Sequence, residues 1–66
     1  MTLDDRIYCL QNTNLPDELQ VKLVEADIAY IQDRDDQATL IITQLENECR
    51  ERGITIYLPK HAAMLV

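Results

Sequence analysis

The chain has 66 residues, of which twelve are acidic and six are lysine or arginine, and its formal net charge is −6. A chain of this length forms one domain, residues 1–66, with a small core and a thin margin of stability. The negative charge repels nucleic-acid phosphates and anionic membranes, so we expect direct binding to neither. No apolar run approaches the roughly 18 residues of a membrane span and no secretory signal is recognisable, so we expect a soluble, cytoplasmic protein.

Chains this short usually need a disulfide, a metal or a second subunit to stay folded. Cys9 and Cys49 lie far apart in a chain with no secretory signal, which favours buried, reduced thiols over a bridge. There is no C-x-x-C pair and the only histidine is His61, so we expect no structural zinc site. Oligomerisation remains as the expected source of extra stability.

The first expected element is a short helix that begins after Thr2. Thr2 and Asp5 have the spacing of a capping box, in which a hydroxyl and a carboxylate bond to each other's backbone N–H groups. Leu3, Ile7 and Leu10 then recur at helical intervals. A strand over the same segment is the alternative, because isoleucine and tyrosine favour strands.

A second helix is expected over residues 15–32, capped by Asn14 and with Pro16 in its first turn, where a missing backbone donor costs nothing. At about 100° per residue, this helix carries two apolar stripes on nearly opposite sides. One stripe, here the Val21 stripe, consists of Val21, Val24, Ile28 and Ile31. The other, here the Leu19 stripe, consists of Leu19, Leu23, Ala26 and Tyr30.

Two apolar stripes on one helix predict two partners, because a surface helix of a small monomer needs only one buried stripe. One partner can be a neighbouring segment of the same chain. We assign the Leu19 stripe to the second partner, another protein chain. The alternative is that the first helix and the C-terminal segment cover this second stripe.

Residues 33–36, Asp-Arg-Asp-Asp, are expected to break the helix, with Asp33 as the N-cap of a third helix and Asp36 in its first turn. Residues 15–32 and 34–52 then form an antiparallel helical hairpin. The alternative is one uninterrupted helix, because the Val21 stripe continues in heptads as far as Arg52, interrupted chiefly at Asp35.

The third helix is expected to present an apolar face to the core, and Leu40 lies off that face as a candidate contact for a partner. The core face consists of Ala38, Ile41, Ile42, Leu45 and Cys49. Gly53 should end the helix as a left-handed residue. Residues 54–58 then alternate as an extended segment or a single strand, which must lie over the helices or pair with another strand. The final residues 61–66 are apolar but few.

Nothing in the sequence points to catalysis. Residues 33–36 superficially suggest a calcium loop, but the sixth and twelfth positions of such a loop would be Ala38 and Gln44 instead of glycine and glutamate. The chain has no serine, and only His61 could serve as the base beside a cysteine nucleophile. A phosphate-binding loop is excluded because Gly53 is the only glycine. We therefore expect no enzyme, no cofactor and no metal.

The sequence thus predicts a mainly all-α fold, a helical hairpin preceded by a short helix and followed by a short extended segment, in an oligomeric protein. The expected function is a non-enzymatic protein-protein interaction module, an adaptor, escort or inhibitor, that acts through an apolar helical face as a homodimer or on another protein. The expected partner-binding residues are apolar or aromatic anchors, namely Leu19, Leu23, Ala26, Tyr30, Leu40 and Tyr57. The alternatives are an acidic decoy that mimics nucleic-acid phosphates and blocks a basic protein groove, and a structural subunit of a larger complex.

Overall fold

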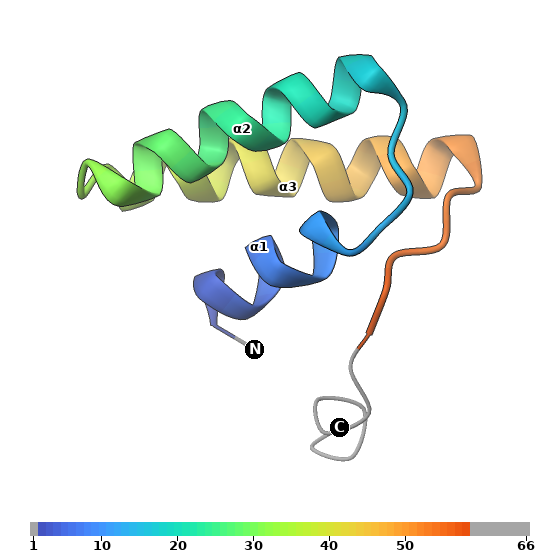
Figure 1. Cartoon of the computed structure of the whole chain (residues 1–66), viewed down its shortest axis with the longest axis horizontal. Coiled ribbons are helices and arrows are strands. Elements are labelled where there is room, and N and C mark those ends of the chain that lie inside the picture. Colours follow the sequence, from blue (N-terminus) through green and yellow to red (C-terminus); the bar gives the residue numbers. More distant parts are fainter. Residues whose placement is uncertain (1, 59–66) are drawn as a thin grey trace.

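The computed structural model describes residues 2–58 and contains three helices, α1 (Leu3–Gln11), α2 (Asp17–Ile31) and α3 (Asp35–Arg52). This confirms the all-α class, and no strand occurs in the described part of the chain. The helices α2 and α3 lie side by side and run in opposite directions, and α1 packs against both (Figure 1). None of the three is long and apolar enough to cross a membrane. The predictions that concern His61 and residues 61–66 lie outside the described residues.

The helix α1 begins at the predicted capping box. The Thr2 hydroxyl accepts a hydrogen bond from the Asp5 backbone N–H at 3.1 Å, and the Asp5 carboxylate accepts one from the Thr2 backbone N–H at 3.4 Å. These bonds satisfy donors that have no partner within the helix. The helix is confirmed, and the alternative of a strand over this segment is wrong.

The helix α2 begins two residues later than expected, and Asn14 does not cap it. Pro16 occupies the N-cap position with extended backbone, and its carbonyl accepts hydrogen bonds from the backbone N–H groups of Leu19 and Gln20. No side chain caps this end. The prediction that Asn14 is the cap is wrong, because the helix starts three residues beyond it.

Asp33 ends α2 and does not begin α3. Its φ of 60° is left-handed, its backbone N–H donates to the Tyr30 carbonyl at 3.2 Å, and the Arg34 backbone N–H donates to the Ala29 carbonyl at 2.8 Å. These two bonds form a Schellman motif, the usual C-terminal closure of a helix. Asp33 can fill the position because aspartate tolerates the left-handed region better than most residues. The predicted break is therefore confirmed, and the predicted N-cap is wrong: Arg34 precedes α3 without a side-chain cap.

A second Schellman motif ends α3 at Gly53, the residue expected to end this helix in a left-handed conformation. Gly53 has a φ of 70°, its backbone N–H donates to the Arg50 carbonyl at 3.3 Å, and the Ile54 backbone N–H donates to the Cys49 carbonyl at 2.8 Å. The following residues, 54–58, have no regular secondary structure, and Ile54 and Ile56 pack partly buried against the core. The Tyr57 backbone N–H donates to the Thr13 hydroxyl at 3.0 Å, which ties this segment to the turn after α1.

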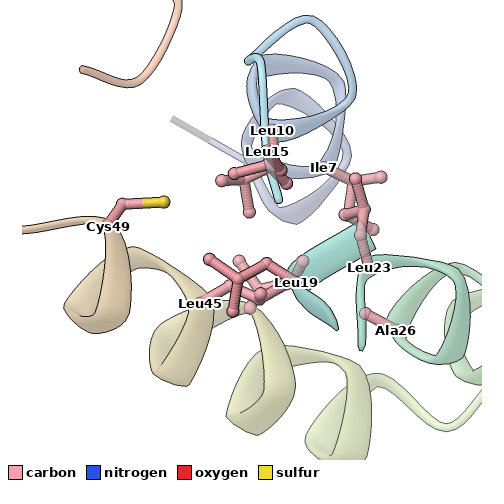
Figure 2. Close-up of a cluster of buried hydrophobic side chains, with 9 residues drawn as sticks. Ile7, Leu10, Leu15, Leu19, Leu23, Ala26, Leu45 and Cys49 are labelled. Atoms are coloured by element: carbon pink, nitrogen blue, oxygen red, sulfur yellow. The ribbon is translucent and has the colours of Figure 1, made fainter. Parts of the chain in front are cut away.

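The core lies between the three helices and is drawn in Figure 2, where side chains from α1 and the turn after it point toward those of α2 and α3. The predicted core face of α3 is confirmed, since Ile41 is half-buried and the other four residues are buried. Both cysteines are buried and unbridged, as expected. The core cluster consists of Ile7, Leu10, Leu15, Leu19, Leu23, Ala26, Ile42, Leu45 and Cys49.

Two arginines join the helices at the edge of this core. Arg6 of α1 makes a two-point ion pair with Glu46 of α3, with N–O distances of 2.6 and 3.1 Å. Arg52 of α3 contacts Glu18 of α2 and also Glu48 within its own helix. The Arg6–Glu46 pair thus links α1 to α3, and the Arg52–Glu18 pair links α2 to α3.

Candidate interaction surface

The structure reverses the expected roles of the two stripes of α2. Leu19, Leu23 and Ala26 are at most 8% exposed, and Tyr30 is half-buried against the core. The prediction that the Leu19 stripe faces outward is therefore wrong, because α1 and α3 cover it (Figure 2). The alternative, cover by the first helix and the C-terminal segment, is right for the first helix; α3 supplies the other side, and Ile54 and Ile56 of the C-terminal segment are partly buried against the same core.

The Val21 stripe is the face of α2 that residues 2–58 leave uncovered. Its four side chains are between 48% and 72% exposed, with Ile31 the most exposed. Their spacing of three, four and three residues is that of alternating a and d positions in a coiled-coil heptad. The helix α2 thus carries the two predicted apolar stripes, but the Leu19 stripe is the buried one and the Val21 stripe is the exposed one, the opposite of what the sequence analysis expected.

The sequence does indicate which stripe is buried, through the residues that continue each stripe along the chain. Leu15 lies four residues before Leu19, prolongs the Leu19 stripe and is buried in the core. The Val21 stripe is prolonged instead by Asp17, four residues before Val21, and by Asp35, four residues after Ile31. Carboxylates in phase with a stripe disfavour its burial, because an unpaired buried charge costs several kcal/mol or more.

A groove of about 450 Å³ lies between α1 and α2 beside the exposed stripe, which it meets at Ile31. The groove has an apolar and aromatic floor with three carboxylates among its lining side chains and no basic residue, so we call it the acidic groove. Its lining consists of Asp4, Asp5, Ile7, Tyr8, Gln11, Asp27, Tyr30 and Ile31. A ligand on the Val21 stripe can therefore reach both apolar surface and negative charge.

A second, smaller hollow of about 240 Å³ borders the stripe at Ile28, on the side of α3. Its charged lining residues are Glu25 and Arg34, so this side has mixed charge. The stripe thus borders the acidic groove at Ile31, this hollow of mixed charge at Ile28, and a hollow of about 300 Å³ without charged lining residues at Val24.

The other two predicted partner residues lie apart from the stripe. Leu40 is 58% exposed, but it lies on the side of α3 turned away from the core. Tyr57 lies edge-to-face against Tyr8, with ring centroids 6.3 Å apart. Since Tyr8 lines the acidic groove, Tyr57 adjoins that groove, whereas Leu40 belongs to a different surface. Their binding of a partner stays a prediction.

Among residues 2–58, the two cysteine thiols are buried and do not line this surface. Burial is the main cause that raises the pKa of the Cys9 and Cys49 thiols, and the charges of Asp5 and Glu46 add to the effect at Cys9. A raised pKa disfavours the thiolate, which is the nucleophilic and metal-binding form. Within residues 2–58, no three histidine, cysteine or carboxylate side chains gather as a metal site would require.

Comparisons of this chain with protein-family models, with curated proteins and with solved structures found no match. The function proposed below therefore depends on the chain's own residues.

Proposed function

We propose that the protein is a non-enzymatic interaction module that binds another protein chain through the Val21 stripe. The observation that supports this proposal is the exposure of four aliphatic side chains at heptad spacing on one helix. Adaptors, escorts and inhibitors all act by occupying a partner's surface in this way. The homodimer expected from the sequence is one form of this function and remains a prediction.

The stripe alone offers a moderate driving force. Full burial of an aliphatic side chain contributes about 1.5 to 3 kcal/mol, and about half of each side chain remains to be buried, so the four supply roughly 3 to 6 kcal/mol. Association also costs several kcal/mol in lost rotational and translational freedom. A specific partner must therefore gain further contacts beside the stripe, and the bordering groove supplies a surface for them.

The acidic decoy has less support than this function. The bases Arg6 and Arg52 pair with Glu46, Glu18 and Glu48, so the surface near these pairs carries charges of both signs. A mimic of nucleic-acid phosphates needs a continuous surface of one sign.

Site-specific photo-crosslinking in the native cell tests the proposal. A benzophenone amino acid replaces Val24 or Ile28 on the stripe, Leu40 on the far side of α3, or Gln44, an exposed polar residue of α3, as the control. We expect adducts of discrete mass from the two stripe positions and none from Gln44. The Leu40 position shows whether that residue belongs to a second contact. Equal adducts from the stripe and the control, or none from the stripe, would contradict the proposed function.

A further inference from the structure

We propose that the occupant of the Val21 stripe is an amphipathic helix of another protein, whose apolar side chains lie on the stripe and whose lysine or arginine side chains lie over the acidic groove. This inference rests on the proposed function and adds the chemistry of the partner. Helix-on-helix docking suits the heptad spacing of the stripe, since a facing helix inserts side chains at matching intervals.

The charge beside the stripe selects a basic partner. Asp4, Asp5 and Asp27 line the acidic groove and no base does. Arg6 is the basic residue of α1. It forms an ion pair with Glu46 and donates a hydrogen bond to the Thr43 hydroxyl at 3.2 Å, so its side chain points toward α3. A partner's cation over the groove therefore meets three carboxylates and no basic side chain among the lining residues, although the Asp5 carboxylate also accepts a hydrogen bond from the Thr2 backbone N–H.

A second copy of this chain places no base opposite these carboxylates when the two α2 stripes pair in register, since Lys22 falls at position b and Arg34 lies beyond the end of α2. With Val21 at position a of the heptad, Glu25 falls at e and Asp27 at g. In an antiparallel pair, e faces e and g faces g, so both carboxylates would meet their own copies. In a parallel pair they would face Gln20 and Gln32, and no ion pair would form. Each chain also carries a net charge of −6, which opposes self-association.

The groove offers one further feature that suits a cation. Tyr8 lines it and is about half exposed, and its ring is steadied by the edge-to-face contact with Tyr57. An arginine or lysine over the face of a tyrosine ring gains a cation–π interaction. The same groove thus presents both carboxylates and an aromatic ring to a basic side chain.

Two synthetic helical peptides test the inference. Both carry isoleucine and leucine at a and d positions over three heptads, and they differ only in having lysine or glutamate at e and g. Fluorescence anisotropy with the whole chain should show that the lysine peptide binds at least about tenfold more tightly at low salt. The ratio should fall below about threefold in 0.5 M NaCl, because salt screens exposed charges. Shifts of backbone amide resonances should map to the Val21 stripe and the acidic groove.

Matched charge variants locate the effect. Asp27→Asn should weaken binding of the lysine peptide by about two- to fivefold, the range for one exposed ion pair. Glu51→Gln is the control, since it removes one carboxylate from an exposed position of α3 away from the groove. Equal effects of the two variants would overturn the assignment of the cation to the groove.

Other occupants appear as distinct results, and each overturns the inference. Equal or tighter binding of the glutamate peptide would show a stripe that docks helices without selecting basic ones. A stable species of twice the 7.6 kDa chain mass, with no binding of the lysine peptide, would assign the stripe to a second copy. Stripe resonances that respond to phosphatidylcholine vesicles but to neither peptide would assign it to lipid. Failure of the stripe to contact any protein is measured separately, by the photo-crosslinking.

Discussion

Replacing Leu19 by alanine should lower the free energy of unfolding by about 2.5 to 4 kcal/mol, whereas replacing Leu40 by alanine should change it by less than about 0.5 kcal/mol. Both substitutions remove the same atoms from a helix, but Leu19 is 2% exposed and Leu40 is 58% exposed. The removed carbons of a buried leucine account for about 2.4 kcal/mol at about 0.8 kcal/mol each. A residual cavity of about 60 Å³ would add about 1.4 kcal/mol at about 24 cal/mol per Å³.

Urea denaturation followed by circular dichroism at 222 nm measures both values. A domain of this size has a total stability of about 3 to 10 kcal/mol, so the Leu19→Ala variant loses a large part of it. If that variant is unfolded in water, Leu19→Met, a volume-conserving change that costs less than about 1.5 kcal/mol, gives a measurable intermediate. Equal losses at the two positions would refute the burial of the Leu19 stripe and restore it as a candidate partner surface.

Three further changes test the helix end, the ion pair and the thiols. Asp33→Gly should raise the free energy of unfolding by about 0.5 kcal/mol, because glycine adopts the left-handed φ of this position without strain. Asp33→Val should lower it by at least about 1 kcal/mol, because a β-branched residue is strained there. The midpoints of urea denaturation measure both changes. Glu46→Gln should cost about 0.5 to 1 kcal/mol in dilute buffer and less in 1 M NaCl, since it removes the charge that faces Arg6. Burial raises the pKa of both thiols, so the folded state holds these protons more tightly than the unfolded state. Stability should therefore fall as pH rises above about 8.5, and less steeply in a double variant with Cys9→Ala and Cys49→Ala, as measured by unfolding from pH 7 to 10.

The features that sequence reasoning predicted correctly are local. The capping box of Thr2 and Asp5 and the stop at Gly53 each depend on bonds within a few residues, so spacing and residue type suffice. Asn14 and Asp33 were misassigned because short polar residues serve equally as N-caps, loop residues and left-handed closures. Which role they take depends on where the adjoining helix ends.

The candidate surface was only half predictable. Two apolar stripes on α2 follow from periodicity, but which one is buried depends on the helices that cover it. Ala26 and Ala29 of α2 and Ala38 of α3 are all buried, and side chains this small allow two helices to approach closely. Leu40 was selected because it lies off the core face of the third helix and Tyr57 because it is aromatic, and the structure places them on separate surfaces.

The arrangement of the three helices explains why the Val21 stripe stays exposed. The core faces of α1 and α3 pack on the other side of α2. Residues 54–58 contact the α1 end of the molecule, where the Tyr57 backbone N–H donates to the Thr13 hydroxyl in the turn after α1. No other segment of residues 2–58 covers the stripe, and the occupant proposed for it is a basic amphipathic helix. If the lysine peptide supplies it, a concentration 100 times its dissociation constant should raise the free energy of unfolding by about 2.7 kcal/mol, provided that it binds only the folded state. The variant Val24→Ser should lose most of this gain while keeping its own stability nearly unchanged, because Val24 is 57% exposed in the free chain. A gain that persists in Val24→Ser would show that the peptide binds elsewhere.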